Sequence, residues 1–243
     1  MSHPSRQDET GRRDEIDVRL AAVRDRIAVA CQDAGRPVTS VTLIAVTKTH
    51  PASDVALLRG LGVADVGENK DQEASAKAAE CVRLGVTDLT WHFVGQLQTN
   101  KAASVVRYAD VVHSADRPRL VRALATQARQ ASRTITCLVQ VSLDGDPDRG
   151  GAPEQQVLGL ADAIAGEDGL ILGGVMAVAP LDGPAGPAFR KLAEIASTVR
   201  AAHPAATAIS AGMSADLEEA IAAGATHLRV GTALLGVRSA FLR

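Results

Sequence analysis

After residue 37, the 243-residue chain alternates between short apolar runs and longer segments with apolar residues at helical spacing. The apolar runs predict eight strands, at residues 41–46, 63–68, 89–95, 110–114, 134–141, 170–178, 206–210 and 226–231. A predicted helix follows each strand, most clearly at 52–61, 70–84, 98–107, 118–131 and 185–202. Eight β-then-α units with almost wholly apolar strands predict an α/β fold, a closed parallel (β/α)8 TIM barrel covered by helices. An open doubly wound sheet is the alternative, but no GxGxxG follows the first strand.

The first 37 residues follow a different pattern. Apolar residues recur between charged ones at helical spacing, as Ile16, Leu20, Val23, Ile27 and Ala30. This predicts one amphipathic helix over residues 14–34, stopped by Gly35. Residues 1–12 are polar and are expected to form a disordered tail. The predicted organisation is therefore one barrel domain over 13–243 with an extra N-terminal helix.

Composition narrows the class of protein. The formal net charge is −2 and aromatic residues make up only 2% of the chain, which argues against a nucleic-acid surface or a base-stacking platform. The three cysteines form no CxxC pair, so a zinc site or disulfide framework is not expected and a reducing cytoplasm fits best. The N-terminus lacks the apolar segment of a signal peptide, and no run is long enough to span a membrane.

The barrel prediction directs attention to the ends of the strands, because active sites of such barrels lie at the carboxyl ends. Polar residues that close a predicted strand, and those just after them, are therefore candidates: Lys48, Glu68, Asn69, His92, His113, Ser114, Ser210, Arg229, Gly231 and Thr232. His113 is better explained as a hydrogen-bonded wall residue than as a metal ligand, since no second ligand has suitable spacing.

Lys48 closes the first predicted strand, in the segment LIAVTKTHP. Its parity matches Ile44 and Val46, so its side chain could project into the barrel mouth. A lysine in an apolar pocket has a lowered pKa, and its free amine becomes a nucleophile for an aldehyde. The alternative is a solvated lysine at the end of a strand.

Two neighbouring turns resemble anion sites. ISAGMSADLEEA runs from a strand through Gly212 into a helix with Ser214 as a plausible N-cap, and RVGTALLG does the same through Gly231 and Thr232. Such turns offer N–H groups and hydroxyls to a phosphate, which these barrels frequently bind after strands seven and eight. With Lys48, they suggest a phosphorylated aldehyde: pyridoxal 5′-phosphate, or the substrate of a phosphosugar aldolase. Arg229 favours the first, because a guanidinium facing a pyridine nitrogen would keep that nitrogen unprotonated.

Five motifs together resemble one family. TKTHP, GENKDQE, WHFVGQLQTNK, SAGMSADLEEAI and RVGTALLG are similar to the successive motifs of the pyridoxal phosphate homeostasis proteins, and the resemblance spans residues 14–240. That family implies a single-domain barrel similar to the N-terminal domain of alanine racemase. This sequence departs from the family pattern at three positions. It has Lys70 where an aromatic residue is usual, Ala211 where Met is expected and Thr47 where Ser is usual.

The resemblance also implies roles for individual residues. Lys48 would form the internal aldimine, a Schiff base, with pyridoxal 5′-phosphate. Ser210, Gly231 and Thr232 would hold the phosphate, and Arg229 would approach the pyridine nitrogen. The remaining positions that match the pocket lining are Asn69, His92, Met176, Gly212, Met213 and Ser214.

The function implied is buffering or delivery of intracellular pyridoxal 5′-phosphate, without strong catalytic activity. The partners would be the cofactor and pyridoxal-phosphate apo-enzymes that receive it, with no nucleic acid and no membrane, and the chain would be a cytoplasmic monomer. The alternatives are a pyridoxal-phosphate-dependent racemase and a barrel that regulates partners by contact. A racemase needs a base on each face of the substrate, and the single tyrosine, Tyr108, is predicted at the end of the third helix that follows a strand, away from the barrel mouth.

Overall fold

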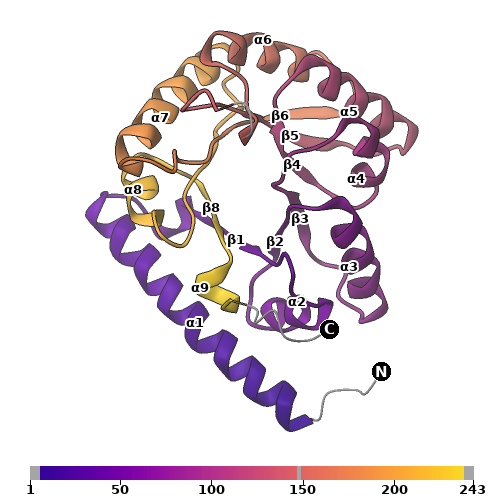
Figure 1. Ribbon diagram of the computed structural model, residues 1–243, viewed down its shortest axis with the longest axis vertical. Helices are drawn as coiled ribbons and strands as arrows, with labels where there is room; N and C mark the ends of the chain where they lie inside the picture. Colours follow the sequence, from indigo (N-terminus) through magenta and orange to yellow (C-terminus); the bar gives the residue numbers. More distant parts are fainter. Residues whose placement is uncertain (1–5, 147–148, 238–243) are drawn as a thin grey trace.

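The computed structural model describes residues 6–146 and 149–237, with side chains from residue 10 onward. Eight parallel strands close into a barrel in the order β1-β2-β3-β4-β5-β6-β7-β8. Figure 1 shows the helices as an outer ring around this barrel. The predicted (β/α)8 fold is confirmed, and both ends of every predicted strand lie within two residues of the observed ends.

The elements follow one another in the predicted order. The strands are β1 Thr42–Val46, β2 Asp65–Glu68, β3 Thr90–Phe93, β4 Val111–Ala115, β5 Ile135–Gln140, β6 Leu170–Met176, β7 Ala208–Ser210 and β8 His227–Val230. The helices are α1 Arg6–Asp33, α2 Ala52–Gly60, α3 Asp71–Arg83, α4 Ala102–Tyr108, α5 Pro118–Gln130, α6 Glu154–Ala165, α7 Ala185–Ala202, α8 Leu217–Ala222 and α9 Thr232–Leu235. Short 3-10 turns at Val38–Ser40 and Thr99–Lys101 precede β1 and α4.

The extra N-terminal helix is longer than expected. Helix α1 begins at Arg6 rather than near residue 14, so residues 6–12 are helical and not a tail; residues 1–5 lie outside the described residues. The reason is tertiary, because Arg12 donates to the Asp54 carboxylate at 2.6 Å and to the carbonyl oxygen of Leu235 at 3.1 Å. These contacts tie the start of α1 to α2 and α9, and local sequence does not encode them.

The buried face of α1 is the one that the spacing predicts. Ile16, Leu20, Val23 and Ile27 are at most 4% exposed, and α1 packs against α8 and α9 (Figure 1). Each buried aliphatic side chain contributes about 1.5–3 kcal/mol relative to exposure, which is an upper estimate. This stripe fixes α1 as an outer layer beside the last two βα units.

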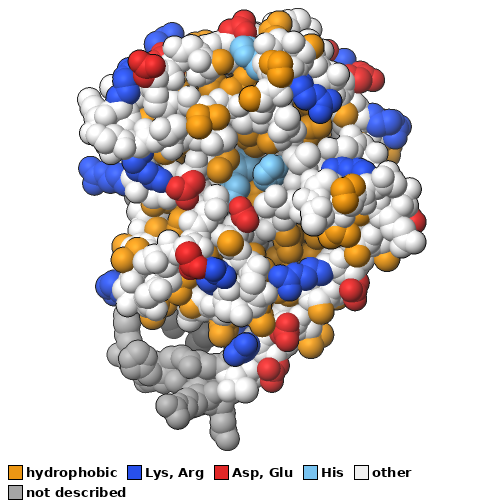
Figure 2. All heavy atoms as spheres, turned by 180° about the vertical axis from the view of Figure 1, so that it is seen from behind, with side chains coloured by type: hydrophobic (Ala, Val, Ile, Leu, Met, Phe, Trp, Pro, Cys, Tyr) orange, Lys and Arg blue, Asp and Glu red, His pale blue; other side chains and the backbone are white. Residues whose placement is uncertain are grey.

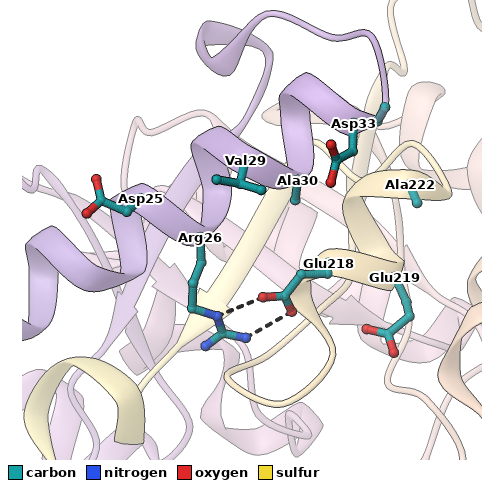
Figure 3. A pocket seen from close by; sticks show the side chains of 9 residues that line it. Asp25, Arg26, Val29, Ala30, Asp33, Glu218, Glu219 and Ala222 are labelled. Carbon is teal, nitrogen blue, oxygen red and sulfur yellow. Dashed lines mark hydrogen bonds and ion pairs between the residues drawn. The ribbon is translucent and has the colours of Figure 1, made fainter.

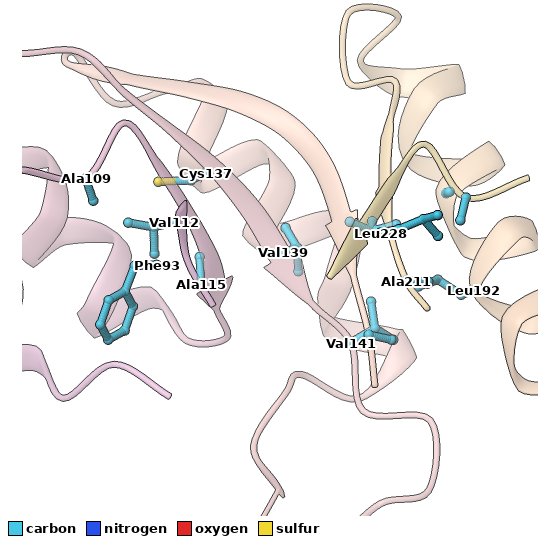
Figure 4. Close-up of a cluster of buried hydrophobic side chains, with 14 of the residues drawn as sticks. Phe93, Ala109, Val112, Ala115, Cys137, Val139, Val141, Leu192, Ala211 and Leu228 are labelled. Carbon is cyan, nitrogen blue, oxygen red and sulfur yellow. The ribbon is translucent and has the colours of Figure 1, made fainter. Parts of the chain in front are cut away.

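The main core lies between the strands and the surrounding helices. Outward-facing side chains such as Phe93, Val112, Cys137 and Val139 pack there with helix residues, as Figure 4 shows. All three cysteines are buried and unpaired. Aliphatic residues and alanine fill most of this core, as the low aromatic content required. The layer holds the strands in register and so positions the residues at their carboxyl ends.

Candidate functional site

Lys48 lies at the carboxyl end of β1, in the turn that follows the strand. The turn is closed by a hydrogen bond from the His50 amide to the Thr47 carbonyl, 3.0 Å long. The Lys48 side chain is exposed and makes no hydrogen bond or ion pair within the described part of the chain, so its surroundings are solvent rather than an apolar pocket. Its amine is therefore available to a ligand at the mouth.

The turn has a strained backbone. Thr49 adopts a φ of 67°, a left-handed conformation that a β-branched residue rarely takes. Such a conformation costs on the order of 1–3 kcal/mol and persists only where its surroundings impose it. The Thr49 amide donates to the Glu73 carboxylate on α3, which provides that restraint. The motifs TKTHP and GENKDQE are thus connected physically.

A buried ion pair supports the same turn from behind. Lys77 on α3 donates to Glu68 at 2.5 Å, to the Thr47 carbonyl at 2.6 Å and to Glu73 at 3.0 Å. Glu68 is fully buried and also accepts the Thr47 hydroxyl at 2.5 Å. Burial raises the pKa of the Glu68 carboxyl, and the opposing attraction of Lys77 does not cancel this effect. Sequence reasoning missed Lys77, since a lysine inside a helix is usually solvated.

The turns after β7 and β8 bring donors together at the same end of the barrel. The Ser214 hydroxyl oxygen accepts the Thr232 hydroxyl at 3.2 Å and the Ala233 amide at 3.3 Å. All three groups belong to part-buried or exposed residues. The Ser214 oxygen occupies the acceptor position that an anion oxygen could take. The expectation that Ser214 caps the next helix is wrong, because α8 begins at Leu217 with Asp216 as its N-cap; Ser214 instead bonds Thr232 in the neighbouring turn.

Two glycines make this arrangement possible. Gly212 has a φ of 89°, and a Cβ there would lie 2.6 Å from the Ala220 Cβ. Gly231 lies close to β1, because a Cβ there would come within 3.2 Å of the Val46 carbonyl oxygen. This close approach places the start of α9 beside the end of β1, two residues before Lys48.

Arg229 and Ser210 form a buried pair beneath this mouth. Arg229 donates to the Ser210 hydroxyl at 2.7 Å and to the Ala177 carbonyl at 2.8 Å. Burial lowers the pKa of Arg229 to about 10, although the nearby Asp216 carboxylate opposes this shift. The resemblance implies that Ser210 holds the phosphate with Gly231 and Thr232; that role stays a prediction, and in the structure the Ser210 hydroxyl bonds Arg229 and lies 2.9 Å from Nδ1 of His113.

A chain of hydrogen bonds continues from Ser210 through the barrel. Ser210 lies 2.9 Å from Nδ1 of His113, whose Nε2 lies 2.9 Å from Nδ1 of His92. The Nε2 atom of His92 lies 2.9 Å from an oxygen of Asp65. Strands β4 and β7 are not neighbours, so the His113–Ser210 contact must cross the interior. Burial lowers the pKa of His113 well below its ordinary value, and the nearby His92, Arg229 and His227 act in the same direction.

The other predicted site residues are dispersed around this centre. Met176 is buried at the end of β6, Met213 is 39% exposed in the turn after β7, and His92 lies in the interior chain just described. Asn69 lines a hollow of about 380 Å³ at the ends of β2 and β3, together with Lys70 and residues 96–98. The described residues contain no group of three or more His, Cys, Asp or Glu side chains arranged to hold a metal.

A larger hollow than the one beside Asn69 lies elsewhere on the described residues. It has a volume of about 780 Å³ and lies between α1 and α8, on the outside of the barrel (Figure 3). Arg26 and Glu218, which line it, bind each other through two hydrogen bonds of 2.7 and 2.9 Å. Its polar groups are thus partly satisfied by one another, and the convergent donors of the mouth lie outside it.

Comparison with known proteins shows the family of the chain. Residues 18–239 match the family profile of the alanine racemase N-terminal domain. The pyridoxal phosphate homeostasis protein of Mycobacterium tuberculosis is 44% identical, with 93% of this chain and 94% of that protein covered. That of Escherichia coli is 36% identical, covering 90% and 95%. The structure of PipY from Synechococcus elongatus with pyridoxal phosphate bound has a TM-score of 0.79 at 35% identity, covering 91% of this chain and 100% of that one.

The fold and the mouth thus define a barrel of the alanine racemase N-terminal class. Within that class, the chain belongs to the family of pyridoxal phosphate homeostasis proteins. The resemblance stated from the five motifs is confirmed. None of the helices in residues 6–146 and 149–237 combines the length and apolar composition that a membrane crossing needs.

Proposed function

We propose that this protein binds pyridoxal 5′-phosphate through Lys48 and serves to buffer or deliver that cofactor. The observation that carries the proposal is the position of an unpaired, exposed lysine beside two convergent anion-binding turns at one end of the barrel. Support comes from relatives named pyridoxal phosphate homeostasis proteins and from the structure of PipY, which has pyridoxal phosphate bound. The buried, unpaired cysteines suit a reducing cytoplasm, where we place the protein as a monomer.

The residues present fit the cofactor's chemistry. Thr232 and the Ala233 amide already donate to an oxygen, that of Ser214, so a phosphate oxygen could take its place. The glycine-lined approach between β8 and β1 would be filled by a Cβ at position 231. When bound, the cofactor supplies an aldehyde that reacts with a primary amine, and Lys48 provides that amine.

The chain's own residues would then divide the work. Ser214, Thr232 and the Ala233 amide bind the phosphate, with Gly231 allowing close approach. Glu73 and Lys77 hold the Lys48 turn in its strained conformation, which limits the directions that the amine can take. Arg229 presents a fixed cationic guanidinium below the mouth, since Ser210 and the Ala177 carbonyl hold it.

A racemase function is the weaker candidate. Tyr108, the only tyrosine, lies at the end of α4 and packs edge-on against Trp91, with ring centroids 6.4 Å apart. Both side chains belong to the outer layer between the strands and the helices. Tyr108 therefore lies away from Lys48, and His92 is committed to Asp65 and His113 inside the barrel. A second base at the mouth is not evident among the described residues.

Cofactor transfer distinguishes the proposed function from the alternatives. Holo-protein mixed with the apo form of a pyridoxal-phosphate enzyme should restore that enzyme's activity, and L-alanine should give D-alanine far more slowly than an ordinary enzyme turnover of about 1 per second. Restored activity without racemisation supports a carrier. Racemisation at an enzyme-like rate that disappears in Lys48→Ala would establish the enzyme instead, and retention of the cofactor without transfer would favour a sensor that regulates partners by contact.

The phosphate turns make a separate prediction. Replacing Ser214 and Thr232 together by alanine should weaken binding of pyridoxal 5′-phosphate roughly tenfold, because each hydrogen bond contributes about 0.5–1.5 kcal/mol net. Binding of unphosphorylated pyridoxal should change little. Fluorescence titration measures the ratio of the two losses in affinity. Ser132→Ala is the control, because Ser132 lies in the turn between α5 and the start of β5, at the amino-terminal side of the barrel. Equal losses for both ligands would place the phosphate elsewhere.

A further inference from the structure

Arg229 is a buried cation without a contacting counter-ion. It is 5% exposed, and within the described residues it forms no ion pair with a carboxylate. Its two bonded acceptors, the Ser210 hydroxyl and the Ala177 carbonyl, are neutral. Removing a charge from water is costly unless hydrogen bonds and opposite charge compensate for it. Asp216 acts on Arg229 only through space. The hydrogen-bond chain from Ser210 to Asp65 is the remaining link between Arg229 and a carboxylate.

With both imidazoles neutral, the two ends of this hydrogen-bond chain give all of its bonds one direction. Arg229 can only donate, and an ionised Asp65 can only accept. Ser210 therefore receives from Arg229 and donates its proton to Nδ1 of His113. Each later link follows in the same sense, with the single proton of each neutral imidazole on Nε2.

The hydrogen-bond chain from Asp65 to Arg229 also spans the barrel interior. Asp65 is the first residue of β2 and its side chain is 28% exposed, whereas His92, His113, Ser210 and Arg229 are at most 5% exposed. Figure 2 shows histidine side chains gathered near the centre of the face opposite to that of Figure 1. The negative end of the chain thus meets water at the amino-terminal side of the barrel, while the positive end lies under the mouth.

We propose that Asp65, His92 and His113 are positioning residues of the cofactor site, which act through Ser210 to supply Arg229 with a remote counter-charge and a fixed orientation. The proposal rests on the proposed function, since it concerns the guanidinium below the cofactor. It adds Asp65 on β2 and His113 on β4 to the site, and it gives His92 on β3 a role through Ser210. Ser210 becomes the link between them and Arg229.

Nuclear magnetic resonance of the apo-protein tests the chain without any cofactor. With nitrogen-15-labelled histidine at neutral pH, His92 and His113 should both be neutral with the proton on Nε2. Signals are assigned with His92→Gln and His113→Gln, and His203→Gln serves as the control outside the hydrogen-bond chain, because His203 lies 2.8 Å from Asp162. A cationic ring, or a proton on Nδ1 of either histidine, would overturn the proposed direction.

Titration with pyridoxal 5′-phosphate then tests the effect on the site. Asp65→Asn should weaken binding roughly tenfold, the lower end of the loss seen when an outer partner of a metal ligand is removed. Asp65→Glu should recover most of it, and Asp110→Asn, which removes a carboxylate bonded to the Trp91 amide and Arg133, should change it little.

A double-mutant cycle separates positioning from general instability. In an Arg229→Gln background, Asp65→Asn should cause no further loss of affinity, because the cation that it serves is gone. The same tenfold loss in both backgrounds would overturn the proposal. If the wild type does not bind the cofactor at all, the proposed function fails. The measurement of the histidine protons still decides whether the hydrogen bonds from Asp65 to Ser210 run in the proposed direction.

Discussion

Replacement of Lys48 by alanine is expected to abolish covalent retention of pyridoxal 5′-phosphate and to weaken its binding by roughly a hundredfold, or about 2.7 kcal/mol. Lys48 is the exposed amine beside the phosphate turns, and its loss leaves only hydrogen bonds to the phosphate and contacts to the ring. The visible absorption of the amine-bound cofactor should disappear, and equilibrium dialysis should show the reduced affinity.

Two neighbouring lysines provide matched controls for Lys48. Lys70 and Lys101 line the smaller hollow at the ends of β2 and β3, close to the mouth but outside the phosphate turns. Lys70→Ala and Lys101→Ala should keep both the absorption and the affinity of the wild type. If either substitution has the larger effect, the assignment of Lys48 is wrong.

The second large effect is expected on stability. Lys77→Met should lower the free energy of unfolding by about 3–5 kcal/mol, because it leaves the buried Glu68 carboxylate without its partner. The same change removes the donor that holds the Thr47 carbonyl, so the Lys48 turn should also lose rigidity. Urea denaturation measures the stability, with equal slopes confirming that the folded states are comparable.

Two variants check the cause of this loss. Glu68→Leu combined with Lys77→Met should recover much of the stability, since replacing both members of a buried pair by apolar residues is often neutral. Arg19→Met, which breaks the exposed pair with Glu15, should cost less than about 1 kcal/mol. A Lys77→Met protein as stable as the wild type would show that the buried pair contributes nothing.

The sequence predicted the barrel well because its signal is local. A parallel strand buried on both faces reads as a continuous apolar run, so the run at 134–141 corresponds to β5 at Ile135–Gln140. The start of α1 was wrong for the opposite reason. Polar residues 6–12 carry no apolar periodicity, and contacts of Arg12 with α2 and α9 stabilise the helix there.

The candidate site was only partly predictable. Ser210 and Ser214 lie four residues apart, on either side of Gly212, whose positive φ turns the chain between them. The alternation of side chains along β7 therefore does not predict the direction of the Ser214 side chain. Only the folded structure shows that its hydroxyl lies beside Thr232. The hydrogen-bonded residues inside the barrel were easier to predict from the sequence. Asp65, His92 and His113 are polar residues at inward positions on three consecutive strands. A strand-by-strand parity comparison would have grouped them.

The most direct test of the central claim is reduction of the holo-protein with borohydride, followed by proteolysis and mass spectrometry of the peptides. Reduction makes the link between the cofactor and its amine permanent, so the modified residue can be read from the fragment masses. We predict that the added mass lies on Lys48 in nearly all of the modified protein. Modification of another lysine in the native wild type, with Lys48 unmodified, would contradict the account.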